Sequence, residues 1–403
     1  MILLKNGERL SRCSQQRKIH NRSNIMKFRT QLAVTAALIL SPVAYSETQD
    51  ITDTPLLLAE NLSYADMAAP EGNHIANALW SSTRTVRNFG RAALGQLDVY
   101  RGPWKEVNPS VKSGKGGQLT TVYNNKANVW LGGLGNWGKV SSTGDVDGYK
   151  YNGGGYSAGA DYAFSNAFTG GLALGETFGK NKARWGYSSI DQRSLMIGTY
   201  GRYKTDVGIW NTLAVDGYFA YGSTRNKANM ELGSSPAIPA HSKWDDNVFT
   251  AGLKFSWDIK SSEYSTWTPF FGIDYIHGKQ DTANLTYGSG SQAFRDGNMQ
   301  VWTIPVGITY KAVIPVGRDQ FFIPEATVAY EGDVSRNNPS VRTDIMGTSV
   351  KTEGSNPGRH ALLANAGARW VMNKNWSIGA YYTFEHRSRM TDHAVNGSLN
   401  YTF

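Results

Sequence analysis

The sequence predicts an all-β fold: a twelve-stranded antiparallel transmembrane β-barrel with an N-terminal α-helix that plugs its pore. Three observations predict this class. Strand-like runs follow one another from about residue 127, and the links between them sort by length. Apolar and polar residues alternate within the runs, and the last run, HAVNGSLNYTF at 393–403, ends the chain in mid-strand. A closed barrel explains such an end, because it pairs the last strand with the first and leaves no open edge.

Composition and the start of the chain indicate an exported protein. The chain has 403 residues, including 44 Gly, 21 Tyr, 15 Phe and 12 Trp, with a mean hydropathy of −0.41. No apolar run reaches the length of a transmembrane helix. The longest, LAVTAALIL at 32–40, follows Lys27 and Arg29 and precedes small residues, the order of a secretory signal peptide. A buried helix is the alternative. We therefore predict a presequence over 1–46, with Met26 as a second candidate start.

Most of the positive charge lies in this presequence. The whole chain has 41 Lys and Arg against 32 Asp and Glu, whereas residues 1–46 hold eight of the basic residues and one of the acidic ones. The remainder is nearly neutral, so charge gives no reason to expect a nucleic-acid partner. The only cysteine, Cys13, also lies there. A mature chain without cysteine suits the bacterial envelope and excludes a disulfide-stapled fold.

The barrel is predicted over 127–403, and its links sort by parity. We place strands near 127–140, 148–165, 168–184, 190–204, 208–224, 243–259, 267–280, 299–314, 320–332, 360–372, 376–387 and 392–403. Long links at 225–242, 281–298 and 333–359 follow odd-numbered strands, and tight links such as 165–167 and 373–375 follow even-numbered ones. This sorting is typical of an outer-membrane barrel, with turns on the periplasmic side and loops outside. A β-sandwich or propeller has no reason to show it.

The apolar face of the strands is predicted to meet lipid. In WSIGAYYTFE at 376–385, Trp376, Ile378 and Phe384 share a face opposite Ser377 and Thr383. No helices are expected to cover an apolar exterior, so this face points into the bilayer. Tryptophans near strand ends predict interfacial girdles: Trp210, Trp257, Trp267, Trp302, Trp370 and Trp376. Glu176 falls on the apolar side of its run, and the glycine-rich run at 129–138 cannot be oriented.

The polar face is predicted to line the lumen with charge. The alternation points five acidic and five basic residues inward: Asp161, Arg202, Lys204, Asp216, Lys254, Asp274, Lys311, Glu325, Arg369 and Glu385. Two interpretations follow. Either the wall is solvated and its mixed charges pair with one another, or these charges hold a charged occupant of the pore.

A candidate occupant, a pore helix over 73–101, precedes the barrel. Apolar residues recur there at roughly helical spacing, with no strand alternation. Its basic face is one-sided, with arginines at i, i+3 and i+7: Arg84, Arg87 and Arg91. A helix of this length spans about 43 Å, enough to cross a bilayer-deep pore. Residues 102–126 are predicted to be a linker that lets the chain turn back into the first strand.

These features resemble the C-terminal translocator domain of bacterial autotransporters, the type V secretion family. The resemblance covers about 73–403 and rests on NALWSSTRTVRNFGRAALGQL in the helix, the strand parity and the end of the chain. It implies the outer membrane of a Gram-negative-type bacterium. The terminal Leu399, Tyr401 and Phe403 are the implied signal for the barrel-assembly machinery. The implied partners are outer-membrane lipid, that machinery and periplasmic chaperones, with a monomeric barrel.

The chain departs from the family pattern before the helix. Family members carry a long passenger there, whereas only 47–72 separates the expected cleavage site from the helix. That segment is too short for stacked repeats and is expected to be exposed or disordered. The helix also lacks the Asn-Asn pair that some members use for self-cleavage. We therefore predict a translocator that anchors and exports a short N-terminal segment.

Two other function classes remain as alternatives. A passive porin or loop-based adhesin would have an unplugged lumen. An outer-membrane enzyme would need a catalytic set, for which the best local cluster is His386, Asp392 and His393. No H-E-x-x-H, P-loop or G-x-S-x-G motif appears, and no metal-ligand spacing. We predict no catalytic residue, no metal and no cofactor, with barrel folding and assembly as the source of energy.

Overall fold

The computed structural model describes residues 64–102, 104–107, 120–144, 146–184, 186–207, 211–232, 237–345 and 347–403. The predicted presequence and most of the predicted exposed segment lie outside these residues. No helix within the described ranges is long and apolar enough to span a membrane.

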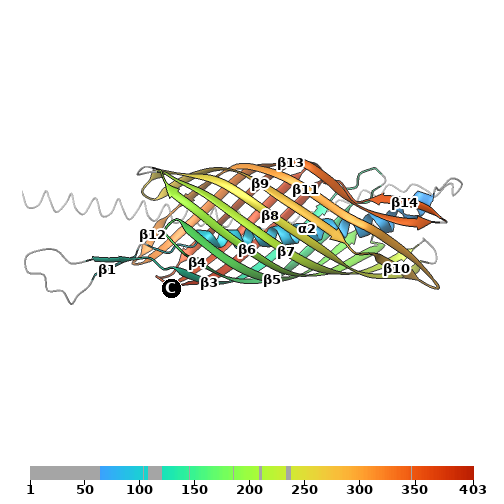
Figure 1. Ribbon diagram of the computed structural model, residues 1–403, viewed down its shortest axis with the longest axis horizontal. Helices are drawn as coiled ribbons and strands as arrows, with labels where there is room; N and C mark the ends of the chain where they lie inside the picture. Colours follow the sequence, from blue (N-terminus) through green and yellow to red (C-terminus); the bar gives the residue numbers. More distant parts are fainter. Residues whose placement is uncertain are drawn as a thin grey trace, which may run out of the picture. The chain divides into compact units, whose positions relative to one another are not determined.

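Twelve strands form a closed antiparallel barrel (Figure 1). They are β3 (Ala127–Val140), β4 (Tyr149–Ala163), β5 (Phe168–Ala183), β6 (Ser188–Asp206), β7 (Asn211–Leu232), β8 (Ile238–Ser262), β9 (Ser265–Gln280), β11 (Gly290–Ala312), β13 (Gln320–Ile345), β15 (His360–Val371), β16 (Trp376–Arg387) and β17 (Met390–Thr402). The last strand pairs with the first, from Met390 opposite Val140 to Thr402 opposite Asn128. The predicted fold class is confirmed, and the chain ends in mid-strand because that strand closes the barrel.

The three predicted long loops are wrong as loops, because most of their residues are paired strand. β7 and β8 stay in register as far as Leu232 opposite Ile238. β10 (Ala283–Tyr287) pairs with β11, and β14 (Thr348–Glu353) pairs with β13. The alternation continues in these segments with small apolar residues turned inward, such as the buried Ala228 and Ala240. Their polar residues face outward, which made the segments look like loops.

The two ends of the barrel are distinct, and we name them by these features. At the loop end the three long hairpins extend. At the turn end lie Phe403 and the short links 164–167, 263–264 and 372–375. There the backbone N–H groups of Lys126 and Ala127 donate to the carbonyl of Phe403. The link between β16 and β17 at the loop end is also short, at 388–389. The two ends therefore differ more in how far the strands extend beyond the barrel than in the length of the links between them.

The outer face carries the apolar residues, as predicted. The exposed tryptophans Trp257, Trp267, Trp370 and Trp376 lie on it toward the turn end, whereas Trp302 is partly buried against Tyr275. Trp210 lies outside the described residues. The glycine-rich run is oriented as well, with Val129, Leu131 and Trp137 exposed and Trp130 buried inside.

Glu176 lies on the outer face, where the sequence placed it. Its carboxylate accepts a hydrogen bond of 2.5 Å from Nε of Arg193 and a second from the hydroxyl of Tyr156. Arg193 also lies over the ring of Phe178, with 5.6 Å between Cζ and the ring centroid. A carboxylate on this wall is tolerated because an arginine on the neighbouring strand pairs with it.

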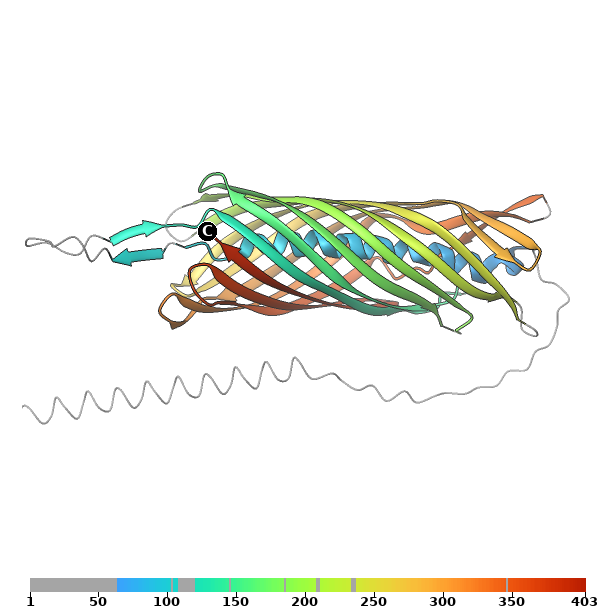
Figure 2. The ribbon, with the colours of Figure 1, turned by 90° about the horizontal axis from the view of Figure 1, so that it is seen from below.

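One helix, α2 (Tyr64–Leu94), runs inside the barrel and is followed by the 3₁₀-helix η1 (Gly95–Asp98) (Figures 1 and 2). The predicted bounds of 73–101 are therefore shifted. Pro70 and Gly72 are poor helix formers and suggested a later start. Tertiary contact overrides this propensity: a Cβ on Gly72 would lie 2.9 Å from the side chain of Thr352 in β14, so the helix packs closely there. The chain is already extended at Val99.

The predicted linker contains secondary structure. β1 (Trp104–Val107) and β2 (Thr120–Tyr123) pair as an antiparallel hairpin apart from the barrel sheet, between the end of η1 and the start of β3. The short runs have no apolar alternation long enough to predict strands from sequence.

Candidate functional site

The helix α2 lies along the lumen with its N-terminal part at the loop end. Nδ1 of His74 lies 2.5 Å from Oγ of Ser188, at the loop-end start of β6. After the helix, η1 reaches the turn end, where Oδ1 of Asp98 accepts hydrogen bonds from Arg202 at 2.9 Å and Lys311 at 3.2 Å. Contacts at both ends of the lumen therefore define the direction in which α2 runs, from the loop end to the turn end.

Apolar packing closes the lumen at the loop end. Ile75 and Ala78 of α2 belong to a buried cluster with Trp244, Leu285 and Phe294 from the extended hairpins. Further along, Leu79, Val86 and Phe89 pack in a second cluster that includes Tyr218, Val248 and Ile276 of the wall. Glycines of the wall make room for this face, since a Cβ on Gly222 would lie 2.4 Å from Val86. The apolar side of α2 is thus fitted to the barrel interior.

The basic face of α2 meets carboxylates of the wall. Arg84 binds Glu385 through two hydrogen bonds, Nη1 to Oε1 at 2.9 Å and Nη2 to Oε2 at 2.7 Å, and also contacts Asp392. Arg84 and Glu385 are 4% and 3% exposed. Paired hydrogen bonds between a guanidinium and a carboxylate give both strength and a fixed geometry.

The other two arginines share a pair of carboxylates. Arg87 contacts Oδ2 of Asp274 at 3.2 Å and Oε2 of Glu331 at 2.7 Å. Arg91 contacts Oε1 of Glu331 at 2.7 Å and also binds Asp274. Asp274 lies on β9 and Glu331 on β13, so these contacts connect the helix to two separate parts of the wall.

Two wall arginines complete the network. Arg387 contacts Oε1 of Glu385 at 2.7 Å and Oδ2 of Asp333 at 2.7 Å, and Arg336 contacts Asp333 at 2.9 Å. With α2 in place, five arginines face five carboxylates: Arg84, Arg87, Arg91, Arg336 and Arg387 against Asp274, Glu331, Asp333, Glu385 and Asp392. Three of these positive charges come from the helix. The wall alone would hold five buried carboxylates against two arginines, an unbalanced charge that is costly in a confined site.

The turn end has the opposite sign pattern. Asp98 follows the C-terminal end of α2 and meets Arg202 and Lys311, which in turn pair with Asp216 at 2.6 Å and Glu325 at 3.5 Å. Nη2 of Arg369 donates a hydrogen bond to the carbonyl of Gly95 at 3.4 Å. Basic groups are favourable there because the C-terminal end of a helix carries a partial negative charge.

The ten predicted lumen residues fall into four groups. Asp274 and Glu385 contact the arginines of α2, and Arg202, Lys311 and Arg369 contact η1. Four others, Lys254, Asp216, Glu325 and Asp161, pair with the wall or with the chain after η1. Lys254 contacts Asp216 at 3.0 Å, Glu325 contacts Lys311, and Asp161 pairs with Arg101. Lys204 is exposed at the turn end of β6, and no ion pair among the described residues includes it.

Sequence reasoning missed much of the network. Glu331, Asp333 and Arg336 fell at or beyond the end assigned to the ninth strand, and Arg387 at the end of the eleventh. Glu331 and Asp333 share the alternation of Glu325, and Arg387 that of Glu385. Following the alternation to the strand ends would therefore have included Glu331 and Arg387, and a ninth strand one residue longer would have included Asp333. The contacts of Asp98 could not be predicted from its position, because the sequence shows it only as an acidic residue after a basic helix.

The candidate catalytic cluster is divided by the barrel wall. Asp392 is buried in the lumen, where it also accepts a hydrogen bond of 2.7 Å from the hydroxyl of Tyr151. His393 stacks on the exposed Trp137 on the outer face, and His386 is exposed beside Phe384. The three groups do not share a site. Within the described part of the chain no group of His, Cys, Asp and Glu could hold a metal ion.

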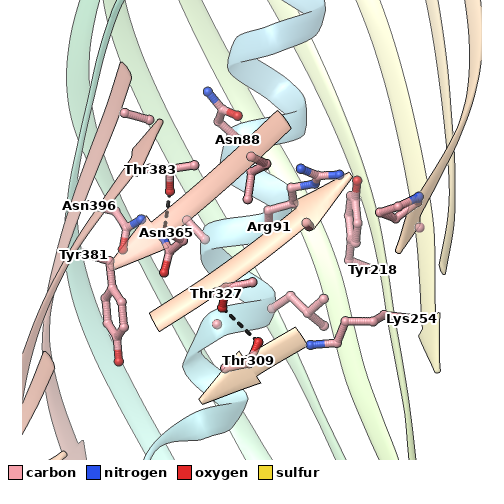
Figure 3. A pocket seen from close by; sticks show the side chains of 18 of the residues that line it. Asn88, Arg91, Tyr218, Lys254, Thr309, Thr327, Asn365, Tyr381, Thr383 and Asn396 are labelled. Atoms are coloured by element: carbon pink, nitrogen blue, oxygen red, sulfur yellow. Dashed lines mark hydrogen bonds between the residues drawn. The ribbon is translucent and has the colours of Figure 1, made fainter. Parts of the chain in front are cut away.

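A cavity remains beside the C-terminal half of α2 (Figure 3). Its volume is about 280 Å³, and its lining includes Asn88 and Arg91 from the helix and Tyr218, Lys254 and Tyr381 from the wall. Threonines and asparagines on its far side bond to one another, as Thr309 does to Thr327 at 2.8 Å. The hydrogen-bonding side chains in the lining can bind water. The loop-end half of the lumen is packed, and the turn-end half is not completely filled.

Comparison with known proteins identifies this architecture. Residues 129–383 match the family model of the autotransporter β-domain. The chain belongs to the autotransporter family. It is the translocator barrel of that family, and its location is the outer membrane.

The translocator barrel has curated relatives in Chlamydia. It is 24% identical over 308 residues to probable outer membrane protein pmp8 of Chlamydia pneumoniae, covering 71% of this chain and 32% of that protein. It is 25% identical over 279 residues to probable outer membrane protein PmpH of Chlamydia trachomatis, covering 64% of this chain and 27% of that protein. The chain thus spans about a third of the length of these relatives.

Solved structures show the same fold at low identity. The translocator domain of autotransporter NalP from Neisseria meningitidis has a TM-score of 0.56 and 16% identity, covering 69% of this chain and 89% of that one. The β domain of the Bordetella autotransporter BrkA has a TM-score of 0.53 and 13% identity, covering 69% of this chain and 100% of that one.

Proposed function

We propose that the translocator barrel exports the segment that precedes α2 and then retains α2 as the plug of its own pore. The observation that carries this proposal is the charge balance of the lumen, in which three arginines of α2 neutralise carboxylates of the wall. A wall with this excess of buried carboxylates suits a permanent basic occupant and does not suit an empty water-filled channel. The alternative of a passive porin requires an open lumen.

The polarity of α2 supports export in one direction. Its N-terminal part lies at the loop end, which we assign to the cell exterior, and η1 lies at the turn end, which we assign to the periplasm. A chain that passes through the barrel in this orientation delivers its N-terminal segment outside and keeps its C-terminal strands in the membrane. No nucleotide motif is present, so folding and barrel assembly supply the energy.

The remaining roles follow from the same proposal. We infer that the barrel is a monomer without enzymatic activity, a cofactor or a metal. Its partners are outer-membrane lipid, the barrel-assembly machinery and periplasmic chaperones, which bind the unfolded chain during transit. Leu399, Tyr401 and Phe403 at the end of β17 present the assembly signal.

An epitope tag tests export directly. The tag is inserted after Ser46, ahead of the segment at 47–72, and a matched control carries it in the turn-end link at Asn166, an exposed residue. In intact cells an external protease should remove the first tag and leave the second. The proposal is wrong if the first tag is protected until the outer membrane is opened although the barrel is folded and heat-modifiable.

A further inference from the structure

The cavity beside the C-terminal half of α2 holds polar side chains that have no partner in the protein. Asn88 of α2, Tyr381 of β16 and Asn396 of β17 line it. None of their side chains forms a hydrogen bond with another residue that the structure describes. Other polar residues of the lining are paired, as Asn365 is to Thr383 at 2.7 Å. Hydrogen-bonding groups inside a folded protein nearly always have a partner in the protein, in water or in a ligand, so this set is a candidate binding site.

These three residues surround one space. Tyr381 is directly opposite Asn396 in the barrel sheet, and directly opposed side chains have Cβ atoms about 5 Å apart. Figure 3 shows both on the side of the cavity that lies opposite Tyr218 and Lys254, with Asn88 of α2 between the two sides. A small molecule in this space can therefore contact the helix and the wall together.

A buried guanidinium borders the same space. Arg369 of β15 lines the cavity and is 1% exposed. It is directly opposite Gly379, two residues before Tyr381 on the neighbouring strand, which places Arg369 and Tyr381 within reach of one ligand. Nη2 of Arg369 donates a hydrogen bond to the carbonyl of Gly95 at 3.4 Å, whereas Nη1 has no partner among the described residues.

Arg369 is also the basic residue of this lining that lacks a carboxylate partner. No ion pair in the described part of the chain includes it. The other three basic residues of the lining each contact a carboxylate at 3.0 Å or less: Arg84 with Glu385, Arg91 with Glu331 and Lys254 with Asp216. Pairs between a guanidinium and a carboxylate are strong and have a fixed geometry. The cavity therefore favours a ligand with one carboxylate.

The rest of the lining matches a polyhydroxylated ring. Asparagine amides and tyrosine hydroxyls both donate and accept hydrogen bonds, and so do the hydroxyls of a sugar. The rings of Tyr218, Phe270 and Tyr381 offer flat apolar faces against which the C–H groups of a sugar ring can pack. The volume of about 280 Å³ lies at the lower end of the range for ligand sites, which suits a ligand no larger than a disaccharide.

We propose that this cavity binds a small sugar acid, a polyhydroxylated ring with one carboxylate, which enters from the turn end. Its carboxylate pairs with Arg369, and its hydroxyls bind Asn88, Tyr381 and Asn396 in place of water. Entry is from the turn end because the loop-end half of the lumen is packed. The inference rests on the proposed retention of α2 in the pore, since the helix provides Asn88 and one side of the cavity.

The test uses the full chain, folded in a neutral detergent, with single-barrel conductance as the check that α2 is docked. D-Glucuronate, D-glucose and acetate are titrated separately, and saturable binding is followed by saturation-transfer NMR. R369Q removes the positive charge, and Y381F removes a hydroxyl that has no protein partner. The matched control is Y382F, the same change at the next residue, whose ring lies on the outer face beside Trp137.

We expect the unmodified protein to bind glucuronate about tenfold more tightly than glucose or acetate, because a charge-assisted pair adds to the hydrogen bonds of the hydroxyls. R369Q should bind glucuronate and glucose equally. Y381F should weaken the binding of both sugars about two- to tenfold through the loss of one hydrogen bond, without changing the temperature at which the heat-modifiable band is lost. Y382F should bind both sugars as the unmodified protein does. Should R369Q fail to fold, N396A takes its place, with the loss expected of Y381F.

Three outcomes would overturn the proposal. One is the absence of saturable glucuronate binding by barrels of low conductance. Another is a preference for glucuronate over glucose that persists in R369Q. The third is binding of acetate as tight as that of glucuronate, which would indicate a site for simple anions. In each case the pore stays closed and the plug is unaffected, whereas an open pore in the unmodified protein would refute the plug itself.

Discussion

Reversing the charge of the helix should unplug the pore. The triple change R84E/R87E/R91E leaves eight carboxylates facing two arginines in the network described above. Loss of one partner from a buried ion pair costs about 3–5 kcal/mol. The three costs do not add fully, because Arg87 and Arg91 share Asp274 and Glu331. The lost ion pairs therefore cost about 6–10 kcal/mol in total, without the repulsion between the new carboxylates and the wall.

This cost has to exceed the apolar docking energy. Burial of Ile75, Leu79, Val86 and Phe89, at about 1.5–3 kcal/mol each, contributes about 6–12 kcal/mol. The single change R84A should therefore leave the helix docked. The triple reversal adds repulsion to a loss that already matches the apolar contribution, so the helix should leave the pore for a large part of the time.

Two measurements detect undocking. Conductance of single barrels in planar bilayers should rise from a low value, and a cysteine placed at Ser82 should begin to react with a thiol reagent. Ser82 is 1% exposed and donates a hydrogen bond of 2.7 Å to Asp246 in the docked state. A matched control reverses three exposed arginines outside the lumen, R225E/R295E/R342E.

Substitutions in the helix and in the wall should also be energetically coupled. E385Q should soften the effect of R84A, because the carboxylate left without its arginine is then neutral. Open-pore conductance in the unmodified protein, together with no change in the triple variant, would refute the plug and restore the porin or adhesin alternative. Deletion of 73–101 should open the pore further than the triple change.

Three further predictions concern assembly, topology and fit. F403S should lower the yield of heat-modifiable barrels and increase degraded chain, while F403W should assemble normally; normal assembly of F403S would reduce the end of the chain to an ordinary strand. A cysteine at Asn229 should react with an impermeant reagent in intact cells, and one at Asn166 only after the outer membrane is opened, with the reverse pattern overturning the orientation. G222L should displace the helix at Val86 and raise conductance, because even a Cβ there would lie 2.4 Å away; an unchanged closed pore would contradict the close fit.

Strand alternation predicted the barrel well because it depends only on which wall of the sheet meets lipid. Trp376, Ile378 and Phe384 could be oriented without knowing any neighbour. The same rule fails where strands leave the membrane, since there the outer face becomes polar too. Lys227 and Asn229 therefore suggested a loop, although Ala228 and Ala240 continue the inward alternation.

The ion pairs between the helix and the wall were harder to predict than the face on which each residue lies. Asp274 and Glu385 were assigned to the lumen from alternation, but their pairing with Arg87 and Arg84 depends on the depth and rotation of the helix in the barrel. Neither is encoded in a local pattern. The helix start failed for a similar reason, because the contact of Gly72 with Thr352 joins segments 280 residues apart in a way that no window of sequence contains.

The two charge clusters also fix the direction of the helix. Arg87 and Asp98 are eleven residues apart, about 16 Å if helical throughout. The wall opposite Arg87 is acidic, and the wall opposite Asp98 is basic through Arg202 and Lys311. A helix inserted end for end would place its arginines against Arg202 and Lys311, and Asp98 against Glu331. Like charges would then meet at both levels, which disfavours the reversed state strongly in a confined space. The lumen therefore selects the orientation in which the N-terminal segment emerges at the loop end.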